Sequence, residues 1–134
     1  MKKLSSIGIK NGIVVCLMGA ITACKSNITT VGDVDANKFE KTIQSNQIQL
    51  LDVRTDKEYS EGHIASAKNI DVLQENFAEK AVATLNKKKT IAVYCRSGKR
   101  SAKACEILKA KGFKTINLLG GFLDWQARGK AVEK

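Results

Sequence analysis

The chain has 134 residues, of which 43% are hydrophobic and 27% charged, so it has room for one globular domain and little else. Its formal net charge is +10, but the basic residues are scattered and few aromatic residues lie among them. This pattern argues against nucleic-acid binding and favours a solvated surface that faces anionic lipid or small anions.

Residues 1–23 have the order of parts of a secretory signal peptide. Three lysines precede an apolar stretch over residues 13–20, which is shorter than the roughly 20 residues of a transmembrane helix. The run Ile21-Thr22-Ala23-Cys24 resembles the lipobox of bacterial lipoproteins, in which the cysteine is acylated and becomes the mature N-terminus. We therefore expect an exported chain, lipid-anchored through Cys24 in the bacterial cell envelope. The alternative is an ordinary secretory peptide with Cys24 as a passenger thiol.

Removal of this segment would leave 20 basic and 13 acidic side chains, a formal charge of +7. Residues 24–31 are short and polar, as expected of a lipidated tether, and residues 32–134 form the predicted domain. Cys16 leaves with the signal and Cys24 takes lipid, so Cys95 and Cys105 remain. Two thiols indicate no disulfide framework.

The first half of the domain alternates predicted strands with helices. An edge strand over 30–34 leads to a helix over 36–44, capped by Asp35, with Phe39 and Ile43 on one face. A strand over 48–53 and a capped helix over 55–59 follow, and Gly62 ends that helix. Residues 67–70 form another short strand.

The second half continues the alternation. A helix over 74–85 is expected to turn Phe77, Ala81, Val82 and Leu85 inward, and a lysine-rich turn precedes a buried strand over 90–94. A helix over 101–111 ends at Gly112. A strand over 115–118, a flexible pair of glycines at 120–121 and a last helix that carries Phe122 and Trp125 complete the domain.

Alternating strands and helices predict an α/β fold with a mainly parallel sheet of about five strands, flanked by helices on both faces. Catalytic groups in such folds gather beyond the carboxyl ends of the strands. Cys95 directly follows the predicted strand over 90–94 and therefore lies at one such end.

The loop after Cys95 favours an ionised thiol. Gly98 lets successive backbone N–H groups point inward, and the helix that follows adds its positive N-terminal end. Arg96, Lys99 and Arg100 add cationic side chains around the same point. Together these features predict that Cys95 has a lowered pKa and acts as a nucleophile.

Several separated motifs resemble a single-domain rhodanese, and they occur in the family's order over about residues 33–130. The family commonly has proline after Gly-His-Ile, whereas this chain has Ala65-Ser66 there and no proline anywhere. The matching residues are Asp52-Val53-Arg54, Glu58-Tyr59, Gly62-His63-Ile64, Ala67, Asn69-Ile70, Cys95-Arg96-Ser97-Gly98-Lys99-Arg100-Ser101, Gly120-Gly121 and Trp125.

This resemblance implies sulfur transfer through a persulfide on Cys95, from an anionic donor of the thiosulfate or polysulfide type to a thiol or cyanide-like acceptor. It implies that the backbone of residues 96–100 holds the persulfide, so Arg96, Ser97, Gly98, Lys99 and Arg100 are the predicted substrate-binding residues. Arg100 has a second possible role as a structural link between the loop and its surroundings. A protein acceptor is a further possibility, and we expect a monomer.

Asp52, Arg54 and Ser101 are expected to support the site, with Asp52 and Arg54 pairing at the sheet edge. His63 is expected to be architectural, since a preformed thiolate needs no base. Cys105 is expected to pack in the core. Cys95, Cys105 and His63 have no recognised metal-ligand spacing, so neither a metal nor a cofactor is expected.

Two other functions compete with sulfur transfer. Related phosphatases and arsenate reductases have a cysteine-to-arginine loop one residue longer, and the four residues between Cys95 and Arg100 would crowd a tetrahedral oxyanion. The second rival is a membrane-anchored sulfur carrier or binding module with little small-molecule turnover. Persulfide released only to a protein partner would favour it.

Overall fold

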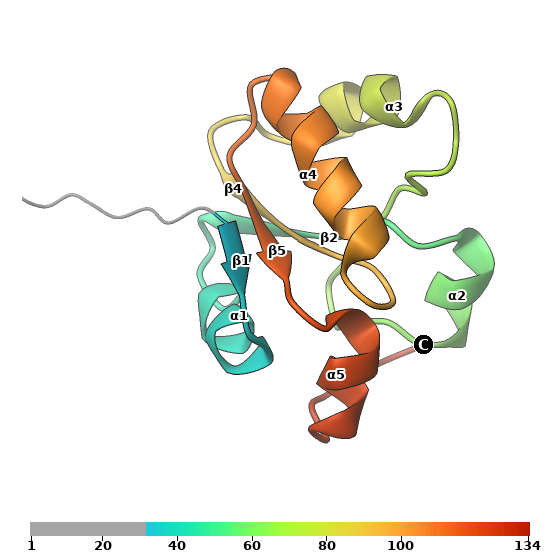
Figure 1. Cartoon of the computed structure of the whole chain (residues 1–134). Helices are drawn as coiled ribbons and strands as arrows, with labels where there is room; N and C mark the ends of the chain where they lie inside the picture. The colour runs from blue at the N-terminus through green and yellow to red at the C-terminus, as the bar shows by residue number, and fades with distance from the viewer. Residues whose placement is uncertain (1–31) are drawn as a thin grey trace, which may run out of the picture. The chain divides into compact units, whose positions relative to one another are not determined.

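The computed structural model of the chain describes residues 32–134. The predicted signal peptide, the acylation site Cys24 and the tether lie outside the described residues. Strands and helices alternate along the described part (Figure 1). The elements are β1 (Gly32–Val34), α1 (Ala36–Thr42), β2 (Ile48–Asp52), α2 (Asp56–Glu61), β3 (Lys68–Asn69), α3 (Phe77–Thr84), β4 (Thr90–Tyr94), α4 (Lys99–Ala110), β5 (Thr115–Leu118) and α5 (Gly121–Ala127).

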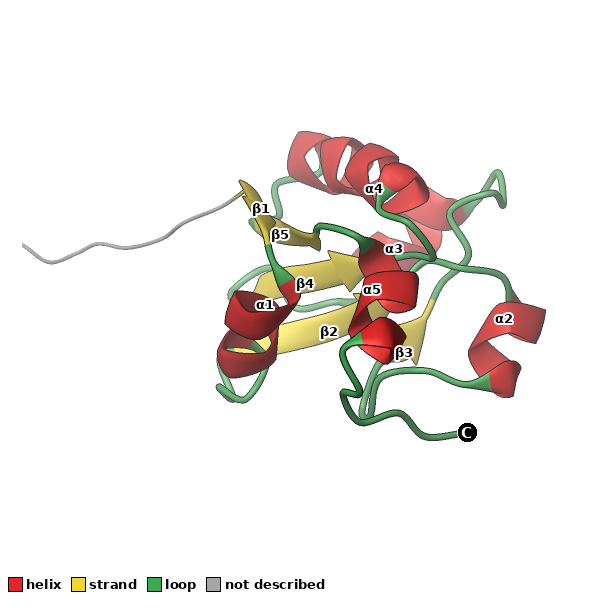
Figure 2. Cartoon of the chain, turned by 60° about the horizontal axis from the view of Figure 1, so that its bottom comes forward, coloured by secondary structure: helices red, strands yellow, loops and turns green. Residues whose placement is uncertain are grey.

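The five strands form one sheet in the order β1-β5-β4-β2-β3, and every neighbouring pair is parallel. The arrowheads of β2 and β4 accordingly point the same way in Figure 2. This sheet confirms the predicted α/β class. Because all strands run in one direction, the loops after β2, β4 and β5 leave the sheet at the same edge.

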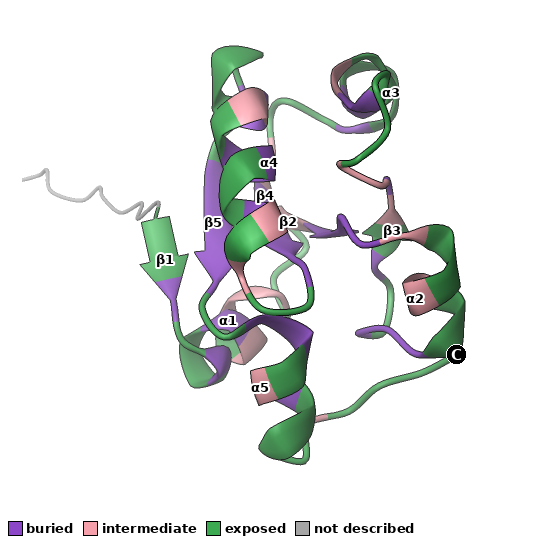
Figure 3. Cartoon of the chain, turned by 45° about the vertical axis from the view of Figure 1, so that its right-hand side comes forward, coloured by how far each residue is buried: buried purple, intermediate pink, exposed green. Residues whose placement is uncertain are grey.

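Helices cover both faces of the sheet, because alternate residues of a strand point to opposite faces. On one face, Leu51 and Val93 pack with residues of α3 and α4. On the other face, Leu50 and Ala92 pack with residues of α1 and α5. Figure 3 shows β5 buried along its length, whereas the edge strand β1 is mostly exposed.

Among residues 32–134, the structure describes two core clusters, one on each face of the five-stranded sheet. No helix among these residues is long and apolar enough to span a membrane.

Local capping signals predicted the first two helices. The side chain of Asp35 accepts a hydrogen bond from Lys38 N at 2.8 Å, which caps α1. Thr55 and Glu58 form a reciprocal capping box on α2, and that helix ends at Gly62 as expected. The strands β4 and β5 have the predicted bounds.

Several predicted boundaries were wrong. Helix α1 ends at Thr42, and β2 and β3 are shorter than expected. Helix α3 begins at Phe77 rather than at residue 74, because Phe77 N bonds Gln74 O in a preceding turn. Val82 is 43% exposed, since the inward stripe of α3 follows residues 77, 81 and 85 and Val82 lies beside it. Helix α4 begins two residues early, at Lys99.

The loop between α2 and β3 contains a strained turn where the family's proline is missing. Ala67 N bonds Ile64 O at 3.1 Å, which closes a β-turn with Ala65 and Ser66 at its centre. Ser66 has a φ of 74°. Residues other than glycine rarely adopt this left-handed conformation, so the backbone of the turn is strained at Ser66.

Candidate active site

Cys95 lies between the end of β4 and the first turn of α4, and its side chain is 1% exposed. Its Sγ accepts a hydrogen bond from Gly98 N at 3.1 Å and another from the Ser101 hydroxyl at 3.3 Å. Ser101 is itself fully buried on α4. The loop therefore curls around the sulfur and directs donors at it.

These donors alter the acidity of the thiol. Burial by itself would raise the pKa of Cys95, because a low-polarity environment disfavours the thiolate. Hydrogen bonds from the Ser101 hydroxyl and from the backbone N–H groups of Ser101, Gly98 and Ser97 outweigh burial and lower that pKa. A lowered pKa increases the fraction of nucleophilic thiolate at neutral pH.

The first residues of α5 form hydrogen bonds with the backbone of this loop. Phe122 N donates to Cys95 O at 2.8 Å, and Leu123 N donates to Arg96 O at 3.1 Å. Gly121, with a φ of 61°, brings its backbone against Arg96 so closely that an added Cβ would lie 2.5 Å from Arg96 C. The glycine pair predicted to be flexible instead allows a close contact between two backbone segments.

Arg100 binds α2 through Glu58. Its two terminal nitrogens donate to the two carboxylate oxygens of Glu58 at 2.8 and 2.9 Å. Foremost through this hydrogen bonding, Arg100 lowers the pKa of Glu58 from 4.5 to about 2, although partial burial opposes the change. Of the two roles open to Arg100, this geometry favours the structural link between the loop and α2.

The other polar residues of the loop face solvent. Arg96, Ser97 and Lys99 are exposed, so the two cations are free to meet an approaching anion. Arg96 also lines a hollow of about 180 Å³ with Arg54, Glu58 and residues of α5. A larger hollow of about 530 Å³ lies elsewhere, lined by residues of α1 and β2, and does not reach the Cys95 loop.

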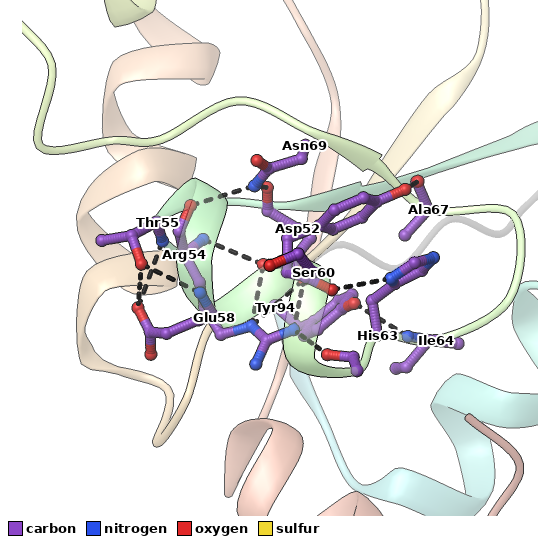
Figure 4. A network of polar contacts seen from close by, with 12 residues as sticks. Asp52, Arg54, Thr55, Glu58, Ser60, His63, Ile64, Ala67, Asn69 and Tyr94 are labelled. Carbon is purple, nitrogen blue, oxygen red and sulfur yellow. Dashed lines mark hydrogen bonds and ion pairs between the residues drawn. The ribbon is translucent and has the colours of Figure 1, made fainter. Parts of the chain in front are cut away.

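Asp52 and Arg54 form the expected pair beside the loop (Figure 4). Arg54 donates from Nη2 to Asp52 Oδ2 at 2.6 Å and from Nε to Oδ1 at 3.0 Å. The same Nη2 donates to Gly62 O at 2.7 Å, and the guanidinium lies 4.2 Å from the ring centre of Phe122. Asn69 donates to the carbonyl oxygens of Asp52 and Arg54, so this network joins β2, β3 and α5.

His63 and Cys105 are both buried and make packing contacts. The His63 ring stacks on Tyr59 with centroids 3.7 Å apart, and its Nδ1 contacts Tyr59 O at 2.9 Å. Cys105 is 6% exposed in the core, and burial raises the pKa of its thiol. Within residues 32–134, no group of three or more metal-ligating side chains is present.

Sequence reasoning gave no site role to Glu58 or Gly121, although both belong to the matching motifs. In the sequence, the role of Glu58 is already explained by the capping box, because its carboxylate accepts hydrogen bonds from the backbone and the hydroxyl of Thr55. Its second partner, Arg100, lies 42 residues away, so no local pattern reveals the pair. The positive φ of Gly121 is compatible with many turns, and only the packed loop shows why a side chain is excluded.

Curated relatives share much of this domain. The chain is 38% identical over 91 residues to the putative sulfurtransferase YtwF of Bacillus subtilis, covering 68% of this chain and 85% of YtwF. It is 36% identical to thiosulfate sulfurtransferase 18 of Arabidopsis thaliana, covering 71% and 78% of the two chains. It is 31% identical to the putative sulfur carrier protein YrkF of B. subtilis, covering 76% of this chain and 55% of YrkF.

A solved structure matches the fold as well. A rhodanese-related protein from Thermoplasma volcanium superposes with a TM-score of 0.68 at 32% identity, covering 75% of this chain and 96% of that one. That chain therefore consists almost entirely of the segment that matches this domain. The family described as rhodanese-like domain matches residues 35–128, and the chain therefore belongs to the rhodanese-like domain family.

Proposed function

We propose that the chain is a sulfurtransferase that carries a sulfane sulfur on Cys95. The observation that carries the proposal is the Cys95 sulfur, which lies at the N-terminus of α4 and accepts hydrogen bonds from Gly98 N and Ser101 Oγ. The relatives named as sulfurtransferases support the same reaction class.

The reaction divides into two balanced displacements. The Cys95 thiolate attacks the outer sulfur of a donor such as thiosulfate, the donor S–S bond breaks, and sulfite leaves with the electron pair. An acceptor thiolate or cyanide then attacks the outer sulfur of the persulfide and becomes an acceptor persulfide or thiocyanate. This second step returns Cys95 as a thiolate, so no separate oxidant or reductant is needed.

Each loop residue has a defined part in this proposal. The N–H groups of Ser97 and Gly98 and the hydroxyl of Ser101 stabilise negative sulfur, whether thiolate or persulfide. Exposed Arg96 and Lys99 attract the anionic donor.

The supporting residues act at a distance from the reacting sulfur. Arg100 holds the loop to α2 through Glu58, and the Asp52–Arg54 pair fixes the neighbouring strand ends. With Cys95 only 1% exposed, a small donor with a terminal sulfur fits this site better than a bulky one.

Mass spectrometry of the intact fragment 32–134 tests the proposal directly. After incubation with thiosulfate, wild type should gain the mass of one sulfur, and cyanide should remove that sulfur as thiocyanate. Cys105→Ser should load like wild type, because Cys105 lies in the core, whereas Cys95→Ser should not load. No adduct with either thiosulfate or polysulfide would refute sulfur transfer and favour a binding module. Persulfide that only a protein partner discharges would favour a carrier.

We further propose that Cys24 is acylated and that the mature chain is a monomer anchored in the bacterial cell envelope. The support is the order of residues 1–24, with a basic start, an apolar stretch and the run Ile21-Thr22-Ala23-Cys24. Mass spectrometry of the mature N-terminus should show a lipidated cysteine, and Cys24→Ala should release the protein into the soluble fraction. Light scattering of the fragment 32–134 should give the mass of one chain.

A further inference from the structure

Two turns at one end of the sheet carry a concentrated positive charge. The turn before β4 contains three lysines, and the last turn of α4 together with the turn before β5 contains three more. Residues 86–90 and 109–115 contain no Asp or Glu. Five of the six lysines are exposed and Lys89 is partly exposed, and none forms an ion pair with another described residue. We call this set the lysine end; it consists of Lys87, Lys88, Lys89, Lys109, Lys111 and Lys114.

The two turns lie side by side although they are more than 20 residues apart in the sequence. Ile91 N bonds Lys114 O at 2.8 Å, which joins the start of β4 to the turn before β5. The Nζ of Lys87 lies 5.6 Å from the ring centre of Phe113. The two lysine-bearing turns are therefore neighbours at one end of the sheet.

Few acidic side chains offset this charge. Glu79 lines the same shallow hollow as Lys111, and Glu106 lies on α4 one turn before its end. The third turn at this end of the sheet, residues 43–47, carries no charged side chain. The lysine end therefore keeps a large positive excess.

The parallel sheet determines what else lies at this end. The lysine turns precede β4 and β5, whereas Cys95 follows β4, so the lysines and the reactive loop occupy opposite ends of the sheet. The described chain begins in β1, where Gly32 pairs with Ile116, two residues after Lys114. Figure 1 shows the start of β1 and the turn before β5 at the same end, and the loop before α4 near α5.

We propose that the lysine end binds the anionic lipid surface of the membrane to which Cys24 is anchored, so that the Cys95 loop faces away from that membrane. This inference rests on the proposed acylation of Cys24. Residues 25–31 span at most about 25 Å when fully extended, because a chain reaches no more than about 3.6 Å per residue. An anchor on so short a tether keeps the nearest end of the domain beside the headgroups.

Electrostatics then sets the orientation. Each lysine near an anionic surface strengthens binding about fivefold, and the attraction decays within one Debye length. The lysine end gains this attraction only when it faces the lipid. A small anionic donor then reaches Cys95 from the aqueous side, where negative lipid does not repel it.

Binding of the fragment 32–134 to vesicles tests the surface without the anchor. The probes are vesicles of equal parts phosphatidylglycerol and phosphatidylcholine, and vesicles of phosphatidylcholine alone. The fragment should bind only the anionic vesicles and dissociate as salt rises toward 1 M, where the Debye length is about 3 Å. The triple variant K87Q/K88Q/K89Q should bind on the order of 100-fold more weakly, from about fivefold per lysine.

A matched variant controls for net charge alone. K57Q/K103Q/K134Q removes the same number of exposed charges away from the lysine end and should bind within about fivefold of wild type. A second measurement uses the unmodified fragment, so it does not depend on any variant folding. Lysine acetylation on anionic vesicles should spare the lysine end and modify Lys57 and Lys103.

The outcomes separate this inference from the proposed function. Equal weakening in both triple variants, equal binding to neutral vesicles, or equal acetylation at the two ends would overturn it. Sulfur loading on Cys95 is measured on the same samples and should match wild type in K87Q/K88Q/K89Q. Failure of loading in every sample, wild type included, would refute sulfur transfer and leave the vesicle result intact.

Discussion

The contact between Gly121 and the Cys95 loop makes Gly121→Ala an informative change. A Cβ at Gly121 would lie 2.5 Å from Arg96 C and 2.7 Å from Ser97 N, distances at which the backbone must shift. The shift would disturb the bonds from Phe122 N to Cys95 O and from Leu123 N to Arg96 O. The substitution therefore affects both the stability of the domain and the geometry around the sulfur.

Gly129→Ala is a matched control for the energy of this change. Gly129 has a φ of 72°, close to the 61° of Gly121, but an added Cβ meets no atom within 4 Å. Both variants carry the left-handed penalty of about 1–2 kcal/mol, and both gain about 0.4–1 kcal/mol from a less flexible unfolded chain. Only Gly121→Ala adds overpacking, at about 1–3 kcal/mol.

Urea unfolding of the fragment 32–134 measures that difference. Gly121→Ala should unfold with a free energy about 1–3 kcal/mol lower than that of Gly129→Ala. Its Cys95 should also load sulfur more slowly at neutral pH, because a displaced loop no longer directs Gly98 N and Ser101 Oγ at the sulfur and the pKa of Cys95 rises. Gly129→Ala should load at the wild-type rate.

Equal unfolding free energies for the two variants would refute the contact as described. Wild-type loading by Gly121→Ala, despite a measured loss of stability, would show that the loop geometry does not control the thiol.

Three further predictions address single residues. Ser101→Ala removes a donor to the sulfur, so the pKa of Cys95 should rise and iodoacetamide should alkylate it roughly tenfold more slowly at pH 7. Glu58 has a folded pKa of about 2, below its usual 4.5, so its pair with Arg100 contributes stability above about pH 4.5 that is lost as pH falls toward 2. Because Glu58 is 24% exposed and its ion pair is partly screened by solvent, Glu58→Gln should lower the unfolding free energy at pH 7 by about 1 kcal/mol and flatten its decrease over that acid range. Ser66→Gly should raise the unfolding free energy by about 1 kcal/mol, since glycine adopts a φ of 74° without strain.

Each of these has a simple contrary result. An unchanged alkylation profile in Ser101→Ala would mean that backbone N–H groups alone set the acidity of the thiol. An unchanged acid dependence in Glu58→Gln would mean that the ion pair adds no net stability. A less stable Ser66→Gly would mean that the serine side chain contributes more than its backbone strain costs.

The sequence by itself predicted the features that depend on neighbouring residues. Asp35 and the Thr55–Glu58 capping box were readable because a helix cap involves residues within one turn. The bounds of β4 and β5 followed from apolar runs between turn signals. The order of these elements was sufficient for the parallel α/β sheet and for the position of Cys95 at a strand end.

Helix limits were predicted less well, because a helix end depends on which backbone groups find other partners. Local hydrogen bonds at Gln74 and Gly98 moved the starts of α3 and α4. The outward Val82 shows the same limit, since a pattern of apolar residues does not specify the width of the face that the sheet covers.

Only the tertiary structure decided how distant segments meet at the two ends of the sheet. At the carboxyl end of the sheet, Arg100 pairs with Glu58, 42 residues away in the sequence, and the backbone of Gly121 packs against the Cys95 loop. At the amino end the fold joined two lysine turns that read as separate, ordinary surface loops in the sequence. The physical reason is that strand order, not sequence order, brings loops together. Strand β5 lies between β1 and β4, and residues of all three strands are buried in one core cluster.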